Sequence, residues 1–190
     1  SALTSVVLNP ASPYDHTFRA SGVGSVVDLS SLAELASGVA LYADGGGEII
    51  APNIVELTGN VYVMAGSTVV LPSATSLIGK ALTVNGSLSL PAMTTLNNST
   101  VTVSESGELT LPEIQLIAGT NITINGNGAF NAPKLTSMEG VSDATRYIST
   151  TGEGDFNAPL LTSLTNVRLF AASGAELVLP ALTGFDFDHS

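Results

Sequence analysis

Hydrophobic and polar residues alternate along this chain in short pieces that recur about every 21 residues. The first piece has two apolar residues around one polar residue, as in 82–84 (LTV) and 101–103 (VTV). The second follows a glycine and ends at a proline, as in 88–91 (LSLP) and 109–112 (LTLP), and the third follows that proline, as in 92–96 (AMTTL). Alternation with a period of two in pieces this short predicts three β-strands per repeat, each with one buried face.

Proline and glycine mark the repeat. The prolines are Pro52, Pro72, Pro91, Pro112, Pro133, Pro159 and Pro180, with Ser30 in the equivalent place of the first repeat. Five or six residues before each lies a glycine: Gly24, Gly47, Gly66, Gly86, Gly107, Gly128, Gly154 and Gly174. We expect the glycine to supply a turn with positive φ, and the proline to end a strand where no ladder N–H is required.

Three strands in about 21 residues match one turn of a three-sided helix. A single coil cannot bury its apolar face, whereas stacked coils about 4.8 Å apart share one core. The sequence therefore predicts an all-β fold, a right-handed three-sided parallel β-helix (solenoid) of about eight coils.

The repeat also predicts three inward columns of side chains. After the glycine these are Val27, Ile49, Val69, Leu88, Leu109, Phe130, Phe156 and Leu177. After the proline they are Leu32, Ile54, Ala74, Met93, Ile114, Leu135, Leu161 and Leu182. The third column is Leu35, Leu57, Leu77, Leu96, Ile117, Met138, Leu164 and Phe185.

The ends of the chain and one long repeat depart from the pattern. We expect residues 1–25 to form an N-terminal cap or a partial first coil, and 26–190 to form the β-helix repeats. The final FDFDHS is expected to be a truncation point that leads into further repeats. The sixth repeat is about five residues longer than the others, which predicts a loop around 141–155.

Charge and composition exclude several classes of partner. Only 11% of residues are charged and the net charge is -11, so Ser, Thr, Asn and Gly must cover much of the surface. The basic residues are scattered at Arg19, Lys80, Lys134, Arg146 and Arg168, which argues against nucleic acid and anionic membranes as partners. No segment resembles a membrane span or a signal peptide. The absence of cysteine excludes thiolate catalysis and favours a bacterial or archaeal source.

Outward residues also recur at the coil spacing and should form ladders. The candidate ligand-binding ladder is Tyr42, Tyr62, Thr83, Thr102, Thr123, Ser149 and Phe170. Its aromatic members either stabilise the stack, by about 0.5–1 kcal/mol per ring pair, or form a platform for a sugar ring or a partner surface. A second ladder is Thr75, Thr94, Gln115, Thr136, Thr162 and Thr183. Threonine suits strands, so this ladder requires no ligand, and Gln115 argues against an ice-binding array.

Acidic residues near the long repeat are the candidate metal ligands. Asp143, Glu153 and Asp155 offer hard oxygen ligands of the kind that calcium prefers, but their spacing matches no known calcium motif and carboxylates near a turn are usually just solvated. We expect no other cofactor.

Enzymatic chemistry finds little support in the sequence. A glycoside hydrolase needs two carboxylates in one cleft, and the repeat predicts no such pair on adjacent coils of one outward face. A polysaccharide lyase needs clustered basic residues, which this chain lacks. His16 and His189 stand in no recognisable triad. We therefore expect no catalysis, and a lyase-type fragment is the least favoured interpretation.

The unit G-x-L-x-L-P-x-L-T-x-L carries a resemblance to known repeats. It is seen at 86–96 (GSLSLPAMTTL), 128–138 (GAFNAPKLTSM) and 154–164 (GDFNAPLLTSL). Across residues 24–190 it resembles repeats of large exported bacterial surface proteins and, more distantly, receptor L domains and fungal cell-wall proteins. The resemblance implies a secreted or cell-surface bacterial protein in which this region is a stalk or adhesin segment.

Two further expectations concern partners. The alternative function is a carbohydrate-binding module that uses the outward Tyr/Thr ladder. The expected partners are a polysaccharide or a surface protein. Exposed terminal coils present unpaired strand edges, which favours end-to-end self-association.

Overall fold

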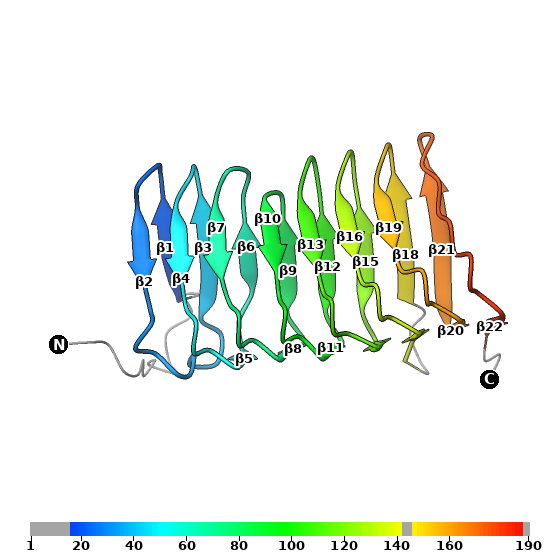
Figure 1. Cartoon of the computed structure of the whole chain (residues 1–190), viewed down its shortest axis with the longest axis horizontal. Helices are drawn as coiled ribbons and strands as arrows, with labels where there is room; N and C mark the ends of the chain where they lie inside the picture. The colour runs from blue at the N-terminus through cyan, green and yellow to red at the C-terminus, as the bar shows by residue number, and fades with distance from the viewer. Residues whose placement is uncertain (1–15, 142–145, 188–190) are drawn as a thin grey trace.

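The computed structural model describes residues 16–141 and 146–187, and in these ranges it consists of strands, turns and irregular segments without a helix. The strands form three parallel sheets, and each coil contributes one strand to each sheet except at the ends. Figure 1 shows the coils stacked along the long axis of the molecule, from the blue N-terminal end to the red C-terminal end. The predicted three-sided parallel β-solenoid of about eight turns is confirmed.

The bounds of the strands follow the repeat. Sheet A contains β1 (Thr17–Ser21), β3 (Ala40–Asp44), β6 (Val61–Val63), β9 (Ala81–Val84), β12 (Thr100–Val103), β15 (Asn121–Ile124), β18 (Arg146–Thr151) and β21 (Val167–Ala172). Sheet B contains β2 (Val26–Asp28), β4 (Glu48–Ile50), β7 (Thr68–Val70), β10 (Ser87–Ser89), β13 (Glu108–Thr110), β16 (Ala129–Asn131) and β19 (Asp155–Asn157). Sheet C contains β5 (Glu56–Leu57), β8 (Ser76–Ile78), β11 (Thr95–Asn97), β14 (Leu116–Ala118), β17 (Ser137–Glu139), β20 (Ser163–Thr165) and β22 (Gly184–Asp186).

The inward columns explain why these coils stack. The strand register aligns Leu109 with Phe130 and Phe130 with Phe156, as the repeat predicts. The rings of Phe130 and Phe156 are stacked inside the core, with centroids 5.2 Å apart and planes 5° apart. Most members of the three predicted columns are buried, and exposure rises in the last coil, where Phe185 is 52% exposed. Each coil therefore buries its apolar side chains against the coils before and after it.

The third strand lies later in the repeat than the sequence suggests. The stretch 92–96 was expected to be a strand, but β11 covers Thr95–Asn97 and the residues just after Pro91 form a turn. Met93 is nevertheless fully buried at this corner. A residue at a corner can be as fully buried as a residue on a strand. The spacing of apolar residues therefore could not show where the strand begins and ends.

Glycine recurs at this position of the repeat for two different reasons. In five coils the glycine lies directly before the strand of sheet B: Gly47, Gly86, Gly107, Gly128 and Gly154. The expectation of a positive φ is wrong at these five positions. A Cβ built on Gly107 would lie 2.2 Å from the carbonyl oxygen of Val84, and one on Gly47 would lie 2.3 Å from that of Ala20. The close approach of the preceding coil therefore excludes a side chain here.

In the other three coils the expected turn conformation is confirmed. Gly24, Gly66 and Gly174 lie one residue earlier, with φ of +79°, +73° and +86°. The residues that follow them carry side chains: Ser25, Ser67 and Ala175. In these three coils the position directly after the left-handed glycine therefore accommodates a Cβ.

The long repeat inserts its extra residues at a single corner. Sheets C and A are joined by residues 119–120 in the preceding coil but by 140–145 in this one, of which 142–145 lie outside the described residues. The predicted loop over 141–155 is wrong for most of its length, because β18 covers Arg146–Thr151 and β19 begins at Asp155. The extra residues leave the ladder intact, since β18 still pairs with both β15 and β21.

The threonine ladder after the proline bonds five coils to the coil before each of them, and Gln115 interrupts it. Each hydroxyl donates to a main-chain carbonyl of the same column one coil earlier: Thr75 to Val55 at 3.3 Å, Thr94 to Thr75 at 3.5 Å, Thr136 to Gln115 at 3.0 Å, Thr162 to Thr136 at 3.1 Å and Thr183 to Thr162 at 3.4 Å. These hydroxyls serve the stack, which agrees with the structural interpretation of this ladder.

Candidate functional site

The outer face of sheet A contains the predicted ligand-binding ladder. The strand register places Arg19, Tyr42, Tyr62, Thr83, Thr102, Thr123, Ser149 and Phe170 in one continuous column. The alternation within each strand turns these side chains outward, and from Tyr42 to Ser149 the two sequence neighbours of every ladder residue are buried. The predicted residues therefore share one face of the molecule.

At the N-terminal end of this column the aromatic rings contact each other and an arginine. The centroids of Tyr42 and Tyr62 are 5.3 Å apart with a tilt of 41°, and the guanidinium of Arg19 lies 5.1 Å from the centroid of Tyr42. Arg19 also pairs with Asp44. Both faces of the Tyr42 ring therefore have protein neighbours, and a sugar that stacks on this ring must displace one of them.

Asp44 anchors this arrangement. A hydrogen bond from the Ser21 hydroxyl, and then the bond and the charge of Arg19, hold the pKa of the Asp44 carboxyl below its usual range. The carboxylate therefore stays ionised into mildly acidic solution and keeps Arg19 over the ring of Tyr42.

At the opposite end of the column the aromatic residue is more accessible. Phe170 is 49% exposed and meets the ring of Tyr147 edge to face, with centroids 6.3 Å apart. Tyr147 lies beside Arg168 in the strand register. Phe170 thus stands apart from the two tyrosines at the far end, with four hydroxyl-bearing residues between them in the ladder.

Between the two ends, the outward positions on the strands of sheet A or directly beside them carry no Asp, Glu, Lys, Arg or His. These positions, which we call the neutral lattice, are Asn60, Tyr62, Met64, Ala81, Thr83, Asn85, Thr100, Thr102, Ser104, Asn121, Thr123, Asn125, Tyr147, Ser149 and Thr151. The nearest charges in sequence, Lys80, Glu105 and Arg146, lie at the corners or at the first residue of β18. The other two sheets carry acids at outward positions, among them Glu48, Glu108 and Asp155 on sheet B and Glu56, Glu139 and Asp186 on sheet C. The acidic charge of the chain is therefore kept off the neutral lattice.

Two polar atoms of the neutral lattice have no hydrogen-bond partner. They are the side-chain carbonyl oxygens of Asn85 and Asn121, both shielded from solvent. The equivalent oxygen of Asn60 accepts the amide of Ala81 at 2.9 Å, and that of Asn125 accepts the hydroxyl of Thr151 at 3.0 Å. Shielded acceptors of this kind are costly unless a donor reaches them.

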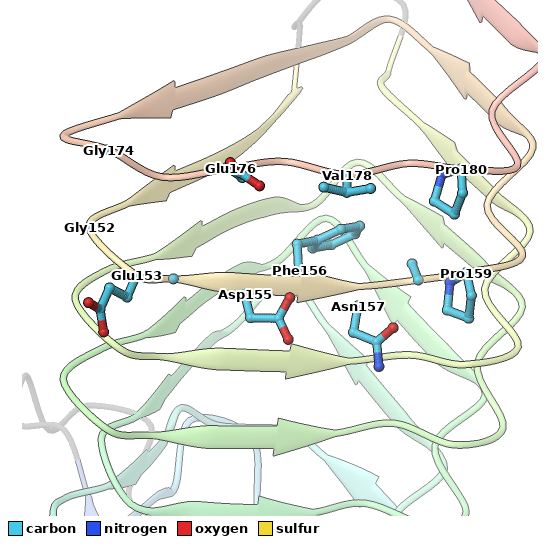
Figure 2. Close-up of a pocket in the computed structure, with 12 residues that line it drawn as sticks. Gly152, Glu153, Asp155, Phe156, Asn157, Pro159, Gly174, Glu176, Val178 and Pro180 are labelled. Atoms are coloured by element: carbon cyan, nitrogen blue, oxygen red, sulfur yellow. The ribbon is translucent and has the colours of Figure 1, made fainter.

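A second candidate site is a groove of about 480 Å³ on the sheet B side, between the seventh and eighth coils. One side of the groove is formed by β19 and the residues around it, and the other side by the segment from Gly174 to Pro180. That segment does not pair with β19 as a strand. Figure 2 shows Asp155 and Asn157 on one side of β19 and Phe156 on the other, with Glu176 and Val178 on the neighbouring coil.

This groove corrects one expectation about carboxylates. Asp155 and Glu176 are both exposed and line the same groove from adjacent coils, although the sequence predicted no such pair. The spacing could have revealed this pair, because Asp155 and Glu176 each lie four residues before the proline of their own coil, Pro159 and Pro180.

Of the candidate calcium ligands, the structure describes Glu153 and Asp155. Glu153 lies between β18 and β19, and Asp155 is the first residue of β19. Asp143 lies outside the described residues. Within residues 16–141 and 146–187, no group of three His, Cys, Asp or Glu side chains is arranged to hold a metal ion. The calcium site stays a prediction.

The fold defines a parallel β-solenoid with a regular outward lattice. A comparison of the chain with protein-family models, curated proteins and solved structures finds no match. Among the described residues there is also no helix of the length and apolarity needed to cross a membrane.

Sequence reasoning missed two features of sheet A. Arg19 was assigned to the N-terminal cap or partial first coil, yet β1 pairs with β3 and places this side chain over Tyr42. The neutral lattice was not predicted, because the predicted ladder contained only its central column. The remaining lattice residues lie two positions before and two positions after each ladder residue from Tyr62 to Ser149, so the sequence does contain the signal.

Proposed function

We propose that this chain is a non-catalytic structural and adhesive module of a secreted or cell-surface bacterial protein. The observation that supports this best is the use of the side-chain ladders to hold the coils together. Threonine hydroxyls bond five coils to their predecessors, and the inward side chains form one buried hydrophobic core from Ala20 to Val167. At about 4.8 Å per coil, eight coils form a rod of about 35–40 Å.

Adhesion by protein-coated beads tests this function. Beads that carry the chain are passed in flow over surfaces coated with polysaccharides and with proteins, and the same polysaccharides are assayed for new reducing ends and unsaturated products. We expect retention of the beads on at least one surface without any product. Product formation by the chain would refute the non-catalytic proposal and favour a lyase-type enzyme, while no retention on any surface would refute adhesion.

A carbohydrate-binding module that uses the Tyr42–Tyr62 pair is the second candidate. It is favoured by two outward rings on adjacent coils, with centroids 5.3 Å apart. A glycan array probed with the parent chain and with Tyr42→Ala and Tyr62→Ala separates the candidates. Loss of glycan binding in both variants supports this module, and binding that survives them excludes the tyrosine pair as the site.

The partners proposed for the module are a polysaccharide or a surface protein, and end-to-end association of terminal coils is proposed as well. The last coil gives a physical reason, because Phe185 and Val178 are 52% and 63% exposed there. Sedimentation velocity over a concentration series measures this association. We expect the sedimentation coefficient to rise with concentration, and a constant monomer value would contradict it.

A further inference from the structure

We infer that the neutral lattice of sheet A binds an uncharged polysaccharide chain. This inference rests on the adhesive function proposed above and names its ligand class. It also moves the binding surface from the tyrosine pair to the hydroxyl and amide side chains between Tyr62 and Tyr147.

The repetition of the lattice is the first argument. Each coil from β6 to β18 presents three outward side chains, about 4.8 Å from those of the next coil and about 6.6 Å apart along the strand. A surface that repeats one arrangement gains most from a ligand that repeats one unit, because every further unit binds without a new loss of translational freedom. A polymer of identical sugar units is such a ligand.

The chemistry of the lattice is the second argument. Its core consists of Thr83, Thr102 and Thr123, flanked by Asn and Ser side chains, so it offers both donors and acceptors. Sugar hydroxyls have the same dual character, and threonine methyl groups provide small apolar contacts for the C–H faces of a sugar.

Charge decides which polysaccharide fits. The chain has a net charge of -11, and the lattice contains neither a cation to bind a uronate nor an anion to repel one locally. The field of the whole molecule therefore disfavours anionic polymers, while an uncharged chain meets no such penalty.

A second copy of this chain is the competing occupant of a flat sheet face. Homodimer interfaces have a core that is more apolar than the rest of the surface. The apolar groups at the centre of the neutral lattice are the methyl groups of Ala81 and of the threonines, and Tyr62, Met64 and Tyr147 lie at its two ends. This distribution favours a hydroxylated ligand over a second protein surface.

Affinity electrophoresis and pull-down test the inference with defined probes. The soluble probes are a neutral β-glucan, a neutral xyloglucan and the anionic polymers alginate and pectate, and the insoluble probes are cellulose and chitin. The test variant is Thr83→Val/Thr102→Val/Thr123→Val, which removes three hydroxyls and keeps a β-branched residue in each strand. Thr110→Val is the matched control, because Thr110 points outward from β13 on sheet B.

We expect at least one neutral probe to bind the parent chain and the Thr110→Val control equally. Each lost hydrogen bond should weaken binding about fivefold, so the triple variant should bind about a hundredfold less tightly. Thr102→Glu, which places a charge at the centre of the lattice, should abolish binding without unfolding the chain, as circular dichroism would verify.

Three results would overturn the inference. They are retention by anionic probes alone, binding to a neutral probe that the triple variant leaves unchanged, and a concentration-dependent dimer that the triple variant dissociates. Each leaves bead adhesion to protein-coated surfaces intact, so failure of this inference is distinguishable from failure of the adhesive function.

Discussion

Replacing Gly107 with alanine tests whether the stacking of coils, rather than the turn, requires glycine. Gly107 has no positive φ, so alanine can adopt its backbone conformation. Its Cβ would nevertheless lie 2.2 Å from the carbonyl oxygen of Val84 and 3.0 Å from the Cα of Asn85. Ordinary contact begins at about 3.4 Å, so the two coils must separate by about 1 Å at this point.

The cost follows from that separation. Overpacking of this kind costs about 1–3 kcal/mol. The nearby bond from the Glu108 amide to the Gly86 carbonyl, 2.8 Å long, would weaken by up to about 1 kcal/mol. Alanine restricts the unfolded chain and returns about 0.5–1 kcal/mol. We therefore expect Gly107→Ala to lower the free energy of unfolding by about 2–3 kcal/mol.

Urea unfolding followed by far-ultraviolet circular dichroism measures this change. Ser106→Ala is the control, because Ser106 is exposed and adjacent, and it should change the stability by no more than about 0.5 kcal/mol. Gly66→Ala isolates the other cause, since Gly66 has φ +73° and no atom within 4 Å of its Cβ position. It should cost about 1–2 kcal/mol through backbone strain alone. The reasoning fails if Gly107→Ala is as stable as the Ser106→Ala control.

Three further predictions follow from other features of the stack. Phe130→Ala should lose about 3–5 kcal/mol and Phe130→Leu less than about 1.5 kcal/mol in the same urea assay, because Phe130 is fully buried against Phe156; equal losses would show that the core does not depend on ring volume. Glu105→Gly should gain about 0.5–1 kcal/mol since Glu105 has φ +60°, while Ser106→Gly should lose a similar amount, and a loss in both would contradict the assigned turn. The lowered pKa of Asp44 stabilises the fold above the pKa of an unfolded aspartate, about 4, and that contribution is lost as the pH falls below it. The melting temperature should therefore fall less between pH 5 and 3 in Asp44→Asn than in the parent chain, and identical pH profiles would refute this.

The sequence predicted the architecture well because the same pattern of inward residues recurs in every repeat. An error in the alignment of one coil changes the predicted column little when seven other coils show the same inward position. The register that joins Leu96 to Leu77 and to Ile117 was therefore readable from spacing alone. Comparison between repeats cannot predict features that occur in a single coil. The unpaired segment that contains Glu176 is one such feature, and the position of Arg19 over Tyr42 is another.

The candidate sites were predicted less completely for a related reason. Spacing tells which side chains share a column, but the orientation of a ring depends on its actual neighbours. The Tyr42 and Tyr62 rings were expected either to stabilise the stack or to form a platform for a ligand. The position of Arg19 over one of them could be recognised only once β1 was known to pair with β3. The two causes of the glycine spacing were likewise inseparable in the sequence, because a left-handed turn and a close backbone approach both select the same residue.

The inserted corner at 140–145 has a consequence for how such a chain can evolve. It adds residues between sheets C and A without shifting the pairing of β18 with β15 or β21. Length changes at this corner should therefore affect folding little. A single-residue insertion inside a strand, in contrast, would turn its outward side chains into the core. The same corner borders the edge of the neutral lattice. Lineages that carry this solenoid would thus be free to diversify the rim of one face by insertion and deletion while its repeating centre stays constant.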